Sequence, residues 1–171
     1  MTKIYIEQIS ETASPIKKGT RDSACFDLCA DLHNIISIDL VKGGVGVYRN
    51  ENGDKIEELK IKPKTRMLIP TGYKMCCDTG YCIEIYPRSG ASFKKGLTLN
   101  NCVGVIDADY RGEVMISIVN NSNQIQTIKH GDPIAQMRLA KLENEELIFG
   151  ELPVTTSDRN GGFGSTDKES K

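Results

Sequence analysis

Two carboxylates stand two residues apart in the stretch "GVIDADYRGEV", at residues 104–114. Asp107 and Asp109 are separated by one alanine, and the phenol of Tyr110 and the guanidinium of Arg111 follow directly. The rest of the stretch is apolar in the manner of a β-strand, which predicts that these polar groups lie at a strand tip. An aspartate there is ionised at neutral pH, since its ordinary pKa is about 3.9, and it can take a proton from water.

Histidine and cysteine chemistry is less well supported by the sequence. The chain has two histidines, His33 and His130, so we expect neither a histidine-based nucleophile–base pair nor a histidine-rich metal site. None of the six cysteines has the C-x-x-C spacing of a zinc or thioredoxin motif. We expect reduced thiols that pack as small apolar side chains.

Two other stretches have a composition suited to anions. "RSGASFKKG" predicts a short helical turn in which Ser89 caps the start and Gly96 ends the helix. Its free backbone N–H groups would form an anion site, or simply belong to an ordinary capped helix. "GGFGST" holds Phe163 between glycines and can stack a ring and wrap phosphates, or it is a frayed terminus.

The elements that must position these residues read as short strands. In "EVMISIV", residues 114, 116 and 118 share one face and residues 115, 117 and 119 share the other. Many such runs, separated by turn residues, predict an all-β barrel, jelly roll or sandwich. Residues of about 41–63 read as a polar hairpin insertion, with its turn at Asn52-Gly53 or Gly53-Asp54.

Length and composition set the broad class. The 171 residues suit one β domain over residues 1–150, followed by a flexible arm over residues 151–171. The net charge is -1 and no basic block suggests a nucleic-acid groove. The N-terminus lacks the apolar core of a signal peptide, and no apolar run is long enough for a bilayer. We therefore expect a cytoplasmic protein that binds neither nucleic acid nor membrane.

The order of five stretches adds to these weak signals. "SACFDLCAD", "PRSG", "NNCVGVIDADYRGEV", "GDPIAQ" and "GGFGST", from about Ser23 to Thr166, resemble the five motifs of the homotrimeric dUTP diphosphatase (dUTPase) family. The resemblance implies a distorted jelly-roll β-barrel with one short helix and a flexible C-terminal arm. It also implies a trimer with composite active sites. The implied reaction is Mg²⁺-dependent hydrolysis of dUTP to dUMP and diphosphate, which keeps uracil out of DNA and supplies dUMP for dTMP synthesis.

The resemblance assigns the nucleoside site to the third motif. Asp107 matches the aspartate that activates the attacking water and touches the sugar 3′-hydroxyl. Tyr110 matches the tyrosine that packs under the sugar and excludes a 2′-hydroxyl. The uracil pocket would be a hairpin of about residues 99–106, which includes Asn101 and Val105. Such a pocket rejects cytosine, because its exocyclic amine leaves a buried polar group unpaired.

The other motifs are assigned to the phosphates and the metal. Asp27 matches an aspartate that contacts the water shell of Mg²⁺, the ion being held mainly by substrate phosphates. Phe163 matches the aromatic residue that stacks over uracil. The residues expected to bind phosphate are Arg88, Ser89, Gly90, Gln136, Arg159, Gly164, Ser165 and Thr166.

The sequence also departs from the family pattern. Cys25 stands where the first motif usually has glycine, and Pro133 stands where a basic residue is common. In the tail, Asp158 takes the place of the usual arginine, with Arg159 one position later, and Asp167 replaces the final glycine. Asp109 matches no functional residue, and we expect it to pair with Arg111.

Two other functions remain open from the sequence. A dCTP deaminase-like enzyme would share the fold, but it needs a group such as glutamate to activate water at the base, and it would release ammonia. A nucleotide-sensing binding module would have no need of a water-activating acid. The intact "IDADY" stretch, together with Ser89 and Gln136, favours the diphosphatase.

Overall fold

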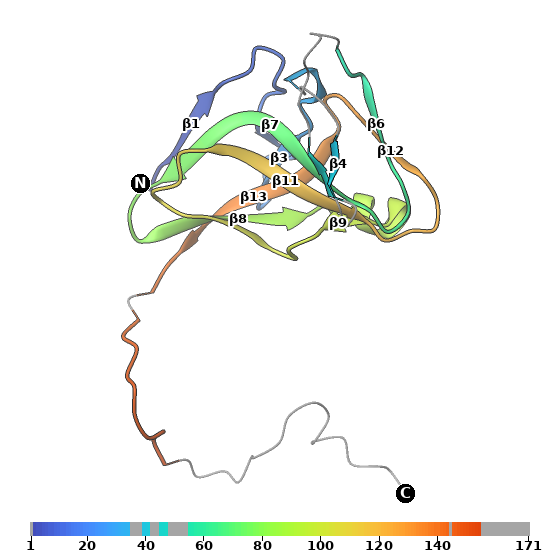
Figure 1. Cartoon of the computed structure of the whole chain (residues 1–171). Helices are drawn as coiled ribbons and strands as arrows, with labels where there is room; N and C mark the ends of the chain where they lie inside the picture. Colours follow the sequence, from blue (N-terminus) through green and yellow to red (C-terminus); the bar gives the residue numbers. More distant parts are fainter. Residues whose placement is uncertain (1, 35–38, 42–44, 48–54, 144, 155–171) are drawn as a thin grey trace, which may run out of the picture.

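The computed structural model describes residues 2–34, 39–41, 45–47, 55–143 and 145–154. Two sheets pack against each other around one apolar core (Figure 1). The first sheet contains, in spatial order, β4 (Asp39–Val41), β5 (Val45–Val47), β7 (Arg66–Cys77), β11 (Glu113–Asn120) and β9 (Leu97–Leu99), and β1 (Ile4–Gln8) also pairs with β7. The second contains β10 (Gly104–Ile106), β8 (Tyr81–Pro87), β13 (Pro133–Lys141), β3 (Phe26–Cys29) and β2 (Lys17–Lys18). The predicted all-β jelly-roll class is confirmed.

Two further strands and two helical turns lie outside these two sheets in the described part of the chain. β6 (Glu58–Ile61) pairs with β12 (Gln126–Lys129) in a separate two-stranded sheet. A 3₁₀ turn, η1 (Leu32–Asn34), follows β3, and a π-helical turn, η2 (Ala91–Lys95), lies between β8 and β9. None of the helices in these described segments has the length and apolar character needed to cross a membrane.

The alternation of side chains decides which residues reach the core and which remain available for a site. In β11, Val114, Ile116 and Ile118 are buried while the intervening residues are partly exposed, as the sequence predicts. In the second sheet, Leu28, Ile83, Ile85 and Met137 point inward. Their strand neighbours Asp27 and Gln136 therefore lie on the outer face of that sheet.

The predicted hairpin over residues 41–63 is wrong in its pairing. Val45–Val47 pairs antiparallel with β4 and parallel with β7, whereas Glu58–Ile61 pairs with β12. Both turn positions expected for it, Asn52-Gly53 and Gly53-Asp54, lie outside the described residues. Glu58–Ile61 is a strand, as an arm of the expected hairpin would be, but its buried Leu59 and Ile61 belong to the main core and not to a polar excursion.

The turn at η2 agrees with the prediction at its end but not at its start. Gly96 adopts a left-handed conformation with φ of 66°, and its N–H donates to carbonyls inside η2. Ser89 is itself helical, and no side chain caps the start of the turn. The helical conformation therefore begins one residue earlier than a serine cap requires.

The six cysteines are free thiols, as expected. Cys77 and Cys82 are buried, and burial raises the pKa of both thiols, which keeps them protonated and apolar. Cys102 is exposed, so the expectation of apolar packing does not extend to it.

Candidate active site

One pocket gathers residues from the first, second and fourth motifs. Asp27 on β3, Gln136 on β13 and residues 88–90 after β8 line a cavity of about 200 Å³, together with Gly19, Ser23 and Cys25. Strand register explains the meeting, because Gln136 lies opposite Asp27 on one side and Tyr86 on the other. Arg88 then emerges two residues beyond Tyr86, at the end of β8.

Arg88 is held in place by two partners. Its Nε lies 3.0 Å from Oδ1 of Asp27, and its Nη2 lies 3.5 Å from Oδ2. Its Nη1 donates to the carbonyl oxygen of Pro133 at 3.2 Å. A planar guanidinium fixed in this way loses little rotamer freedom when a phosphate arrives. Pro133 thus contributes through its carbonyl, although the family often has a basic residue there.

The pocket also contains neutral hydrogen-bonding groups. Nε2 of Gln136 donates to the carbonyl oxygen of Pro87 at 2.9 Å, which leaves its second N–H available. Ser89 and Gly90 are exposed at the first turn of a helical segment, where backbone N–H groups have no intrahelical acceptors. The rim residue Ser23 is fixed by a hydrogen bond from the N–H of Thr20 at 2.9 Å. Cation, amide and hydroxyl donors therefore converge, as an oxyanion ligand requires.

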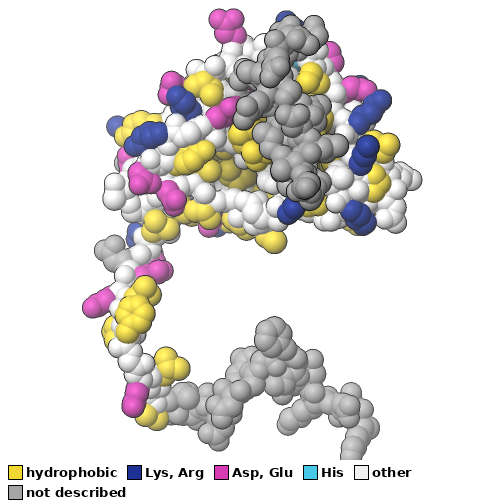
Figure 2. Space-filling model, viewed as in Figure 1, with side chains coloured by type: hydrophobic (Ala, Val, Ile, Leu, Met, Phe, Trp, Pro, Cys, Tyr) yellow, Lys and Arg dark blue, Asp and Glu magenta, His cyan; other side chains and the backbone are white. Residues whose placement is uncertain are grey.

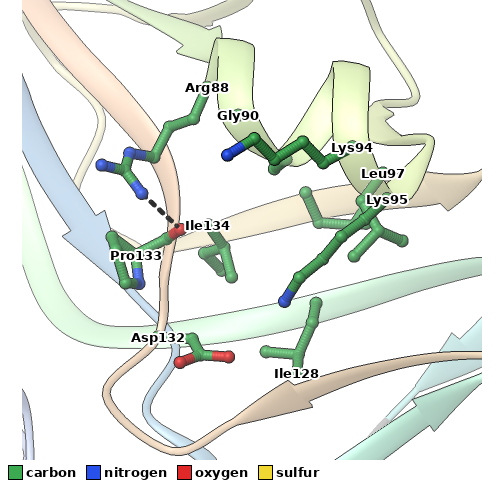
Figure 3. A pocket seen from close by; sticks show the side chains of 11 residues that line it. Arg88, Gly90, Lys94, Lys95, Leu97, Ile128, Asp132, Pro133 and Ile134 are labelled. Atoms are coloured by element: carbon green, nitrogen blue, oxygen red, sulfur yellow. Dashed lines mark hydrogen bonds between the residues drawn. The ribbon is translucent and has the colours of Figure 1, made fainter.

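A neighbouring cavity extends this cationic surface. It measures about 230 Å³ and shares Arg88 and Gly90 with the first pocket. In Figure 3, the side chains of Lys94 and Lys95 extend from η2, the first toward Arg88 and the second toward Asp132. Across the two cavities the three cations Arg88, Lys94 and Lys95 outnumber the two carboxylates, Asp27 and Asp132, which favours anionic ligands.

The third motif forms a braced turn after β10. The N–H of Tyr110 donates to the carbonyl oxygen of Asp107 at 3.1 Å, which closes the turn. The guanidinium of Arg111 donates to the carbonyl oxygens of Ala108 and Tyr110, at 3.0 and 2.8 Å. The expected ion pair between Arg111 and Asp109 is therefore wrong: the guanidinium binds the main chain of the turn instead.

The loop before β10 carries the residues expected at uracil. β9 and β10 belong to different sheets, so residues 99–106 are a crossover between sheets and not the expected hairpin of paired strands. Within it, Cys102 has a φ of 60°, and the N–H of Val103 donates to the carbonyl oxygen of Asn101 at 2.6 Å. β10 is the terminal strand of its sheet, and Val105 is 58% exposed there. An open strand edge presents N–H and C=O groups to a ligand.

The two groups of residues lie at opposite ends of β8. Ile106 pairs with Ile83, so Asp107 follows beside Cys82, whose pKa is raised by burial, by Glu84 and by Asp107. Arg88 is six residues further along the chain than Cys82, which corresponds to about 20 Å at about 3.3 Å per residue. Within one chain, the carboxylate of Asp107 is therefore not brought to the pocket of Arg88, Ser89 and Gln136.

Sequence reasoning missed two features of this region. It did not identify Gly19 as a pocket residue, and it gave no role to Gly112, against whose backbone the side chain of Tyr110 packs. The predicted tail residues Arg159, Phe163, Gly164, Ser165 and Thr166, and the departures Asp158 and Asp167, lie outside the described residues.

Comparison with known proteins places these features in a family. A family model described as dUTPase matches residues 55–167. The deoxyuridine 5′-triphosphate nucleotidohydrolase of Finegoldia magna is 51% identical over 109 residues, which cover 64% of this chain and 76% of that protein. A mutant dUTPase of Staphylococcus bacteriophage 80alpha, solved with dUpNHpp, has a TM-score of 0.70 at 20% identity and covers 96% of this chain and 98% of its own.

A second solved structure has a similar fold and concerns a metal. A mutant dUTPase of phage phi11 of S. aureus, described as coordinating a structural Mg(II) ion, has a TM-score of 0.66 at 20% identity. It covers 90% of this chain and 99% of its own. The ordered motifs, the shared fold and the match over residues 55–167 agree, and the chain belongs to the dUTPase family.

Proposed function

We propose that this protein hydrolyses dUTP to dUMP and diphosphate through attack of water on the α-phosphorus. The proposal is carried by the single pocket in which Asp27, residues 88–90 and Gln136 meet, in a chain of the dUTPase family. Turnover of dUTP keeps uracil out of DNA and supplies dUMP for dTMP synthesis.

Asp107 is the group we assign to water activation. Its carboxylate takes one proton from the attacking water as the oxygen bonds to the α-phosphorus and the bond to the diphosphate oxygen breaks. Its exposed position at the end of β10 leaves it free to face a substrate. Tyr110, on the same turn, provides a flat surface for the deoxyribose, and its proximity excludes a ribose 2′-hydroxyl.

The pocket at the end of β8 is assigned to the phosphates. Negative charge grows on the departing diphosphate, and the fixed guanidinium of Arg88 stabilises it electrostatically. The hydroxyl of Ser89, the N–H of Gly90 and the remaining N–H of Gln136 add hydrogen bonds that need little reorganisation.

The free edge of β10 is assigned to the base. Asn101 and the main chain near Val105 offer donors and acceptors that match uracil. Cytosine reverses one donor–acceptor pair and leaves a buried group without a partner, which costs binding energy.

The donor set in the phosphate pocket fits Mg²⁺. One carboxylate, Asp27, lies there, and the described residues contain no cluster of three or more metal-ligating side chains. Mg²⁺ keeps several waters and binds through one or two carboxylates plus substrate phosphates, so a protein cage is not required. When bound, the ion neutralises phosphate charge. Asp27, held by Arg88, would contact its water shell.

We further propose that the active form is a homotrimer in which neighbouring chains complete each site. The separation of Asp107 from Arg88 along β8 supports this, because both must approach the same α–β phosphate linkage. The segment after β13 supports it too: its apolar side chains leave the body and are almost fully exposed in one chain (Figures 1 and 2). These residues are Leu147, Ile148, Phe149, Leu152 and Val154. Exposed apolar surface of this extent marks an interaction site.

In this proposal the tail residues complete the substrate site. Phe163 is assigned to stacking over uracil, and Gly164, Ser165 and Thr166 to wrapping the phosphates. Arg159 is assigned to the terminal phosphate. Residues 151–171 then act as an arm of the β domain over residues 1–150.

Product analysis tests the proposed function. The protein is incubated with dUTP, dCTP, dTTP and UTP, each with and without Mg²⁺, and the products are separated. We expect dUMP and diphosphate from dUTP alone, with Mg²⁺ required. Ammonia from dCTP would move the chemistry to the base and support the deaminase-like alternative. Tight dUTP binding without any turnover would support a nucleotide-sensing module.

A further inference from the structure

Tyr110 rests directly on the backbone of Gly112. A Cβ atom placed on Gly112 would lie 2.5 Å from the hydroxyl oxygen of Tyr110, 2.8 Å from its Cζ and 3.3 Å from its Cε2. Real Cβ atoms essentially never approach other atoms more closely than 3.0 Å. The ring therefore occupies the space that any side chain at position 112 would need.

The backbone that binds the Tyr110 hydroxyl is itself held in place by further hydrogen bonds. The hydroxyl of Tyr110 donates to the carbonyl oxygen of Glu113 at 2.9 Å. The carboxylate of Glu113 accepts the N–H of Gly72 at 2.9 Å, and the next carbonyl, of Val114, accepts the hydroxyl of Thr71 at 2.7 Å. Position 113 is thus fixed to the irregular part of β7, where the register with β11 shifts. These hydrogen bonds hold the ring of Tyr110 in a fixed position relative to the sheet.

The backbone at Gly112 does not need glycine for conformational reasons. Its φ is not among the positive values found for other glycines, such as Gly72 at 75°. Alanine would therefore be accepted by the backbone, and the three atoms nearest to its Cβ would all belong to Tyr110. This separates a steric role of Gly112 from a role in forming the turn.

We propose that Gly112 is a positioning residue that seats the ring of Tyr110 and thereby sets discrimination against the ribose 2′-hydroxyl. This inference rests on the proposed function of the site. With Gly112 the hydroxyl end of the ring packs against the backbone of the turn that also carries Asp107, so the sugar surface and the water-activating carboxylate keep one fixed relation. A methyl group at position 112 unseats the ring, breaks its bond to Glu113 and opens space beside the 2′-carbon.

The experiment is a double-mutant cycle with Gly112→Ala and Tyr110→Ala. The kcat/KM of the full-length protein is measured for dUTP and UTP with Mg²⁺. We expect Gly112→Ala to raise the KM for dUTP more than it lowers kcat, and to reduce the dUTP preference by about tenfold or more. In the Tyr110→Ala background, the same substitution should change the preference by less than about twofold, because no ring remains to be displaced.

Two results would overturn the inference. One is an unchanged preference in Gly112→Ala. The other is an equal loss in both backgrounds, which would place the effect in the backbone. Melting temperatures control for folding. A crystal structure of Gly112→Ala tests the position of the ring independently of enzymatic activity. The 2.9 Å hydrogen bond between the Tyr110 hydroxyl and the Glu113 carbonyl must be lost. If the wild-type protein does not turn over dUTP, the proposed function fails while this structural test still decides the role of Gly112.

Discussion

Mixing two inactive variants of the protein is the sharpest test of a site shared between chains. One variant is Asp107→Asn, which removes the proposed base. The other is Ser89→Ala combined with Gln136→Ala, which removes two phosphate donors but leaves the ion pair of Asp27 and Arg88 intact. Each should lose at least about 10²-fold in turnover on its own, from loss of general-base catalysis or of transition-state hydrogen bonds.

The expected recovery follows from the geometry of β8. If the site takes Asp107 from one chain and residues 88–90 with Gln136 from its neighbour, a closed ring has one such junction per chain. In a 1:1 random mixture, half of the junctions have an intact Asp107 and half have an intact pocket. Both conditions hold in about one quarter of junctions, so activity should rise to about one quarter of the wild-type value. Activity plotted against mole fraction should be bell-shaped, with its maximum at equal amounts.

The assay is dUTP turnover after the two differently tagged variants exchange subunits or are co-expressed. A matched control mixes the single variants Ser89→Ala and Gln136→Ala, whose defects lie in the same half of the site. That mixture should show no maximum, because every pocket keeps one defect. If activity in the main experiment varied linearly with mole fraction between the two low values, the shared site would be refuted. That result would also mean that Asp107 reaches Arg88 within one chain, against the separation of about 20 Å.

Three further outcomes are expected. Asp107→Asn alone should lower kcat by about 10²–10⁴-fold while nucleotide binding, measured by calorimetry, remains; full activity would reject the assignment of the base. Asn120→Ala should lower the free energy of unfolding by about 3 kcal/mol, or the melting temperature by roughly 10 °C, because the buried amide makes four hydrogen bonds. Glu84→Gln should reduce the fall in melting temperature that the protein shows as the pH is lowered. Hydrogen bonds from Tyr86 and Arg138 lower the pKa of Glu84, so its contribution is present above its ordinary pKa and is lost as pH falls through the lowered value. Melting temperatures from pH 3 to 7 check this, and parallel profiles for the two proteins would contradict it.

The sequence predicts the strands well because the alternation of side chains along a strand is local information. The two-residue alternation of β11 identifies its buried face, and the left-handed Gly96 ends the helical turn where a glycine is expected. The resemblance to the dUTPase motifs assigns Asp27 to the water shell of the metal and Arg88 and Gln136 to phosphate. The structure brings these three side chains together in one pocket, while their roles stay predictions.

Strand partners could not be predicted in the same way. Glu58–Ile61 has the pattern of a hairpin arm, but that pattern is the same whether its partner is the preceding strand or β12, which lies more than sixty residues later. The pairing partner of this strand depends on which part of the core Leu59 and Ile61 can cover. Arg111 is a similar case, since a carboxylate two residues away is a plausible partner by charge, yet the closed turn places two carbonyl oxygens nearer.

The position of Asp107 shows why a residue's chemistry and its working partner are separate questions. Its type and its neighbours Tyr110 and Arg111 indicate a water-activating acid at a strand tip. The register of β10 on β8 then puts that acid at the opposite end of the strand from Arg88. A local sequence pattern cannot reveal this, because the two motifs are close along the chain and in the same sheet. The direction of the strands supports the proposal that a second copy of the chain completes the site, and the mixing experiment tests that proposal.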